Sequence, residues 1–275
     1  MNFDNVIFAF ALTLFAGMST GIGSALAFFT KRTNTKFLSY SLGFSAGVMI
    51  YVSLVEIFQK AVMSFGEEHS VKTATFYTIL SFFGGILFIA IIDKLIPSYE
   101  NPHEIRNIED VDEAEQEIKT KNKQLARMGI FSAIAIAIHN FPEGIATFTA
   151  GLSDTSIAVP IAIAIAIHNI PEGIAVSIPI FYATGNRKKA FILSFLSGLA
   201  EPVGALIGFL IIYFFTNGIN PNITGLMFGS VSGIMVFISL DELLPTAEKH
   251  GEHHIAIYGL VSGMAVMAVS LLLFM

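Results

Sequence analysis

Two histidine–glutamate pairs are the residues of this sequence best suited to chemistry. His139 precedes Glu143 by four residues, and His168 precedes Glu172 by the same spacing. Residues four apart lie one above the other on a helix, so each pair presents an imidazole and a carboxylate on one face. These groups bind Zn²⁺ well and Fe²⁺, Co²⁺ or Mn²⁺ acceptably. Because the sequence contains no cysteine, any metal must be held by nitrogen and oxygen atoms.

Further polar residues lie beside the two pairs. Asn140 and Asn169 follow the histidines directly, about 100° around the helix, and can reach the same space. Pro142 and Pro171 each free a backbone carbonyl one turn earlier, which gives the helix another candidate oxygen ligand. Glu201, in the segment GLAEPVGA, adds a third carboxylate. It could bridge a second ion or balance the charge of the first.

The elements that carry these residues are strongly apolar. Hydrophobic residues make up 54% of the 275 positions and charged residues only 13%, whereas a soluble domain carries about a quarter charged residues. Runs of about 20 apolar residues span a bilayer. The sequence therefore predicts an all-α, polytopic membrane protein. We expect one transmembrane domain over 1–275, with a cytoplasmic loop at 97–128 and eight spans near 5–30, 37–63, 73–96, 129–151, 156–182, 190–216, 222–246 and 254–275.

Buried glutamates in such spans need a counter-charge. An ionised glutamate at the bilayer centre costs at least about 2.5–3.5 kcal/mol, and neither 129–151 nor 156–182 contains Lys or Arg. A divalent cation would offset this cost, with two histidines and two glutamates as a four-ligand set. The alternative is a set of interhelical hydrogen bonds that only holds the bundle together. Uncompensated glutamates make that alternative unfavourable.

The basic residues predict the orientation. All Lys and Arg residues except Lys60 and Lys72 lie in or beside the connections that follow the first, third, fifth and seventh spans. Loops rich in Lys and Arg stay in the cytoplasm. We therefore expect both termini to be extracytoplasmic, in the inner or plasma membrane of the cell.

Internal repeats are legible in the sequence. AIAIAIHNFPEGIA (133–146) recurs as AIAIAIHNIPEGIA (162–175), and GFSAGVMIYVSLVEIF (43–58) is matched by GSVSGIMVFISLDELL (229–244). Paired spans cross the membrane in opposite directions, so the repeats are inverted. Transporters of this design bind substrate near the midplane, at the repeat interface.

A weaker repeat and two matched glutamates complete the pattern. FAGMSTGIGSALA resembles LSGLAEPVGALIG, which predicts three helices, a central pair and three more. Glu56 lies towards the outer end of the second span, and Glu242 towards the cytoplasmic end of the seventh, beside Asp241. These residues suit an entry and exit relay. A structural role is the alternative, because both positions lie closer to water.

The central segments resemble a known family. HNFPEGIA and HNIPEGIA are similar to the signature helices four and five of the ZIP (Zrt/Irt-like) metal transporters. AEPVGA and SLDELLP resemble its bacterial branch, of the ZupT and GufA type. The resemblance implies a metal site that can be binuclear, with the ligands His139, Asn140, Glu143, His168, Asn169, Glu172 and Glu201.

The predicted function is transport of divalent metal ions towards the cytoplasm. Zinc is expected first, with iron, manganese, cobalt or cadmium as further ions. We expect membrane lipid as the surroundings, no nucleic-acid partner and no catalytic cofactor, and the small-residue helix faces are compatible with a homodimer. His250, His253 and His254 either receive metal or belong to a solvated loop.

Two other functions compete with transport. An intramembrane metal-dependent enzyme would be expected to carry a His-Glu-x-x-His or Glu-x-x-His helix, and the predicted spans contain neither motif. A metal-sensing receptor could signal through the loop 97–128. Inverted repeats disfavour a receptor, because sensing does not need alternating access. The sequence therefore favours a protein that is not an enzyme.

Overall fold

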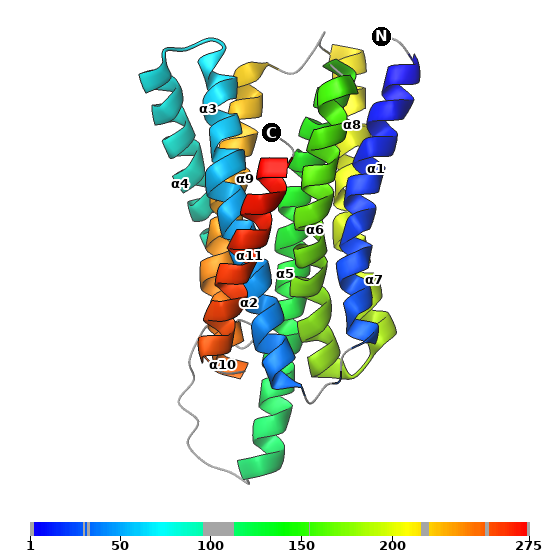
Figure 1. Ribbon diagram of the computed structural model, residues 1–275, viewed down its shortest axis with the longest axis vertical. Helices are drawn as coiled ribbons and strands as arrows, with labels where there is room; N and C mark the ends of the chain where they lie inside the picture. The colour runs from blue at the N-terminus through cyan, green and yellow to red at the C-terminus, as the bar shows by residue number, and fades with distance from the viewer. Residues whose placement is uncertain are drawn as a thin grey trace.

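The computed structural model describes residues 3–29, 31, 34–95, 113–153, 155–215, 220–250 and 253–273, and this part of the chain is helical (Figure 1). The first half contains α1 (Phe3–Ala25), η1 (Leu26–Phe28), α2 (Thr35–Val52), η2 (Ser53–Ile57), α3 (Phe58–Gly66) and α4 (Val71–Leu95). The second half contains α5 (Glu113–Ser153), α6 (Thr155–Thr184), α7 (Arg187–Gly198), α8 (Ala200–Phe215), α9 (Pro221–Ile238), η3 (Ser239–Leu243), α10 (Leu244–His250) and α11 (His253–Leu273).

The all-α membrane fold is confirmed. Seven helices among the described residues are long and apolar enough to cross a membrane. They are Phe3–Ala25, Thr35–Gly66, Val71–Lys94, Ile165–Thr184, Arg187–Leu210, Pro221–Lys249 and His253–Leu273. Helix α5 is not among the seven, so the count of eight spans and the arrangement of three, two and three helices remain predictions.

Helix α5 is much longer than a membrane span. Its 41 residues extend about 60 Å, twice the thickness of the hydrocarbon core. Its first turns project beyond the other helices at one end of the bundle, while α1 begins and α11 ends towards the opposite end (Figure 1). The predicted loop 97–128 is thus helical from Glu113 onward, and its residues 97–112 lie outside the described part.

Asparagine is the N-cap residue of α2, α7 and α9. Asn34 accepts a hydrogen bond from the Phe37 amide (3.1 Å), Asn186 from the Lys189 amide (2.9 Å) and Asn220 from the Asn222 amide (2.8 Å). Each satisfies a backbone donor that the first turn leaves free. These caps fix where α2, α7 and α9 start.

The helices form two groups, which lie on the right and left of Figure 1. In the first group α1 packs on α6 and α7, and α5 packs on α6 and α8. In the second group α2 packs on α11, and α9 packs on α3 and α4. Helices far apart in the sequence therefore pair within each group.

Glycines allow matched close approaches in the first group. A Cβ atom at Gly23 of α1 would lie 1.9 Å from the carbonyl oxygen of Ile170 in α6. One at Gly204 of α8 would lie 2.1 Å from the carbonyl oxygen of Phe141 in α5. Gly23 matches Gly204 in the weaker repeat, and Phe141 matches Ile170 in the first. The two repeats therefore make the same helix contact twice.

The second group repeats its own contacts in the same way. A Cβ atom at Gly47 of α2 would lie 2.0 Å from the Leu260 carbonyl oxygen of α11, and one at Gly233 of α9 would lie 2.0 Å from the Phe82 carbonyl oxygen of α4. Gly47 and Gly233 are matching repeat residues. Both repeat copies also end in a π-helical turn, η2 and η3.

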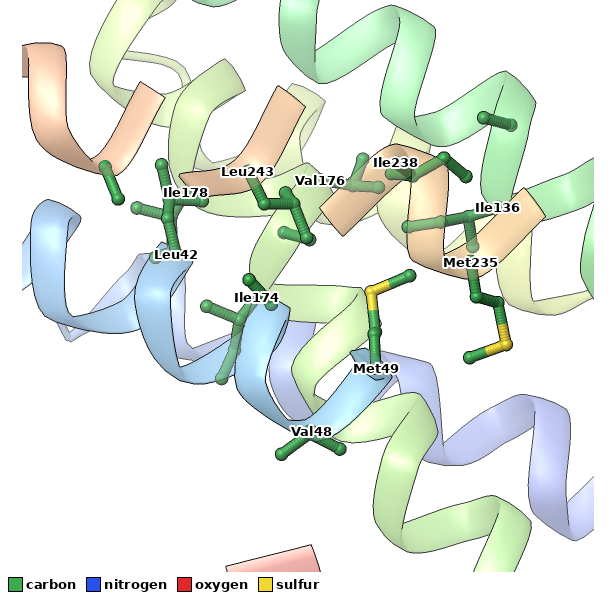
Figure 2. Packing of buried hydrophobic residues seen from close by; sticks show 14 of the residues in the cluster. Leu42, Val48, Met49, Ile136, Ile174, Val176, Ile178, Met235, Ile238 and Leu243 are labelled. Carbon is green, nitrogen blue, oxygen red and sulfur yellow. The ribbon is translucent and has the colours of Figure 1, made fainter. Parts of the chain in front are cut away.

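An apolar core joins the two groups. Figure 2 shows residues of α2, α5, α6 and α9 with η3 packed against one another, including Leu42, Met49, Ile136, Ile174, Val176, Ile178, Met235, Ile238 and Leu243. Hydrogen bonds also cross it, from Ser45 Oγ to the Pro171 carbonyl (2.7 Å), from Tyr182 Oη to the Asn34 carbonyl (2.5 Å) and from Ser132 Oγ to Glu242 (2.7 Å).

Candidate metal site

Three helices of the first group bring three carboxylates into one region. Glu143 of α5, Glu172 of α6 and Glu201 of α8 are 5%, 0% and 0% exposed. Glu143 and Glu172 lie near enough to Glu201 to act on it electrostatically. Like charges repel strongly where water is excluded, so the region has a strong preference for a cation.

An asparagine holds the third carboxylate in place. Asn169 Nδ2 donates to Glu201 Oε1 and also to the Ala16 carbonyl oxygen of α1 (2.9 Å). Ser19 Oγ donates to the same Ala16 oxygen (2.6 Å) and to the Ala166 carbonyl (2.9 Å). The backbone of α1 therefore orients Asn169, which in turn orients Glu201.

Asn169 Oδ1 and Glu201 Oε2 are buried oxygen atoms of this region that have no hydrogen-bond donor among the described residues. A buried acceptor without a donor is costly, and a carboxylate with an available oxygen is a hard ligand for a divalent ion. These two atoms are the best-defined candidate ligands in the described part.

Local structure explains why Glu201 reaches the site. Helix α7 ends at Gly198 and α8 begins at Ala200, so Glu201 lies in the first turn of α8. The positive end of a helix dipole favours a carboxylate there. A Cβ atom at Gly144 would lie 2.0 Å from the Glu201 carbonyl oxygen, so only glycine allows α5 to approach this turn.

The rest of the predicted ligand set is only partly described. Asn140 is fully buried on α5. His139 and His168 lie on α5 and α6, but their side chains lie outside the described part. Among the described side chains, no group of three His, Asp or Glu is preassembled for a metal. The structure thus brings Glu143, Glu172, Asn169 and Glu201 into one region and leaves the two imidazoles untested.

Glu242 lies at the boundary between the two helix groups. It is fully buried on η3, and Ser132 Oγ of α5 donates to its Oε2 atom (2.7 Å). Asp241 beside it is partly exposed. No pattern in the sequence pointed to Ser132, because a single serine in an apolar helix is unremarkable.

Glu56, at the matching position of the other repeat copy, has a different partner. Lys60 Nζ lies 2.7 Å from Glu56 Oε1, one helical turn away, and the two side chains are 28% and 17% exposed. The spacing of four residues was the available sequence signal for this pair. The prediction of a relay at Glu56 did not include this pair.

Comparison with known proteins decides the family. The family model described as ZIP zinc transporter matches residues 4–271. The chain belongs to the ZIP family. It is 59% identical to a protein named zinc transporter ZupT from Clostridium perfringens, covering 99% of this chain and 98% of that one. Proteins of the same name from Chlorobium chlorochromatii (62%, covering 98% and 99%) and Streptococcus mutans (63%, covering 97% of both) are equally similar over their lengths.

In this ZIP-family chain, His253 and His254 are exposed at the start of α11. His253 Nδ1 lies 2.9 Å from Glu248 Oε1, with side chains 63% and 39% exposed. The His254 ring stacks on Tyr258, and the side chain of His250 lies outside the described part. One carboxylate and one imidazole do not make a closed metal site, so the role of this turn stays open between the two predicted alternatives.

Proposed function

We propose that this chain transports divalent metal ions across a cell membrane, with zinc as the main substrate. Membership of the ZIP family and near-full-length similarity to proteins named zinc transporters support this function. The observation that carries it is the cluster of three buried carboxylates on α5, α6 and α8. The comparisons give no support to an enzyme or a receptor.

The proposed metal ligands are the residues predicted from the sequence. They are His139, Asn140, Glu143, His168, Asn169, Glu172 and Glu201. Three carboxylates with their amide neighbours offer more oxygen atoms than one zinc ion needs, which favours two ions in the site. Nitrogen and oxygen ligands also accept iron(II), manganese, cobalt and cadmium, which we propose as secondary substrates.

The proposed route passes the two repeat-related glutamates. Metal enters past Glu56, sheds water at the central site and leaves past Glu242 and Asp241. Exposure alternates as the first helix group rocks against the second. The apolar core between the groups supports this motion, since contacts between apolar side chains are not directional (Figure 2).

Orientation and setting complete the proposal. Basic residues concentrate in or beside the connections of the end where α5 projects, which supports a cytoplasmic location for that end and an extracytoplasmic location for both termini. Transport then runs inwards across the inner or plasma membrane. We propose lipid as the surroundings of the bundle and a homodimer as its assembly.

Metal accumulation in cells tests the function. Cells that express the wild-type chain should accumulate zinc, and His139→Ala or Glu143→Ala should reduce the gain at least about tenfold, because each removes a proposed ligand. Glu67→Ala, at an exposed glutamate of the α3–α4 turn, is the matched control and should transport normally. Full uptake by both site variants at normal expression would refute the proposal.

A further inference from the structure

The inverted repeat makes Glu56 and Glu242 equivalent, yet the chain neutralises them differently. Glu242 receives a hydrogen bond from Ser132 of the first helix group. In the matching position of α6 the sequence has Ile161 in place of a serine. Glu56 receives a lysine ammonium one turn along its own helix instead, and the residue that matches Lys60 is Thr246. The lysine one turn after the glutamate is therefore present in only one copy of this repeat.

The two oxygen atoms of the Glu56 carboxylate differ in their surroundings. Its Oε1 atom accepts from Lys60 Nζ at 2.7 Å. Its Oε2 atom is buried and has no hydrogen-bond donor among the described residues. A carboxylate with one oxygen on a displaceable cation and the other without a donor is poised to bind a second positive charge.

The backbone around Glu56 is fixed. The π-helical turn η2 carries this residue, and Ser232 Oγ of α9 donates to the Ser53 carbonyl oxygen (2.7 Å). The turn packs on α9 of the second helix group. Glu56 is therefore held in place by that group.

Lys60, in contrast, is in contact with water. Its side chain is 28% exposed and carries a strongly hydrated ammonium group on a flexible stem. When it swings into water, it leaves the carboxylate free and loses little solvation. A divalent ion interacts with the same carboxylate twice as strongly as a monovalent charge at equal distance.

We propose that Lys60 is a tethered competitor that occupies Glu56 until a divalent ion displaces it. This inference rests on the proposed function and adds a residue that sets its affinity. The ammonium group excludes monovalent cations from Glu56, because they carry no more charge than an ammonium that is held one helical turn away. It also raises the metal concentration needed to occupy Glu56. Lys60 therefore raises the apparent KM for metal supplied from the side of the bundle that carries the termini.

Zinc flux into proteoliposomes of the purified protein measures this effect. Lys60→Gln should lower the KM for zinc by about two- to fivefold, the strength of a partly exposed ion pair. Lys60→Met should do the same, which guards against one variant failing to fold. Lys60→Arg keeps the charge and can bind both carboxylate oxygens, so the KM should stay at or rise above the wild-type value. In a Glu56→Gln background, adding Lys60→Gln should change nothing.

The controls separate this mechanism from a general charge effect. Lys72→Gln removes the other lysine near the same end and should leave the KM unchanged. An unchanged or raised KM in both folded Lys60 variants would overturn the proposal. So would a decrease that persists without Glu56, or one that Lys72→Gln reproduces. Absence of zinc flux in the wild-type protein would instead overturn the proposed function itself.

Discussion

At the scale of single residues, buried polar side chains hold carboxylates in place. Asn169 bridges α1 to Glu201, and Ser132 bridges α5 to Glu242 across the boundary between the helix groups. Both carboxylates lie within the internal repeats described above. Small neutral donors thus position both carboxylates.

Removing the Ser132 hydroxyl tests this view of the residue scale. Ser132→Ala deletes one donor to the buried Glu242 and should lower the free energy of unfolding by about 0.5–2 kcal/mol, as buried hydrogen bonds in membrane proteins are modest. Thermal unfolding in detergent measures the loss. Glu67→Ala, at an exposed side chain of the α3–α4 turn, is the control. Equal melting temperatures for Ser132→Ala and the wild type would contradict this role.

At the scale of elements, glycines decide which helices can meet. Close approaches at Gly23 and Gly204 in one group, and at Gly47 and Gly233 in the other, recur at matched repeat positions. Small residues drive helix association where the hydrophobic effect cannot. The repeats therefore encode helix contacts as well as ligands.

Gly144→Ala tests the element scale at the site itself. The new Cβ atom would lie 2.0 Å from the Glu201 carbonyl oxygen, so α5 and α8 must move apart. We expect a loss of about 1–3 kcal/mol in stability and a clear fall in zinc flux. Gly84→Ala is the matched control, since a Cβ atom there meets nothing within 4 Å. Wild-type stability and flux in Gly144→Ala would show that this contact is not needed.

At the scale of the whole molecule, the sequence allowed prediction of the class, the family and the repeats. Apolar runs and the doubled HN-x-PEG segments are local patterns, and they are strong because membrane spans obey simple length and charge rules. The Glu201–Asn169 bond and the two helix groups depend on packing between distant segments, so no local pattern reveals them. The Glu56–Lys60 pair, in contrast, is local, and its spacing of four residues on a helix was enough to predict it.

The most direct test of the central claim is zinc flux into proteoliposomes, with a Glu143→Ala/Glu172→Ala double variant beside the wild type. The account predicts saturable flux in the wild type that falls at least about tenfold in the double variant, because the variant removes two of the three clustered carboxylates. Parallel assays with iron(II), manganese and cadmium would rank the substrates. Equal flux through both proteins, or tight zinc binding without any flux, would contradict the account.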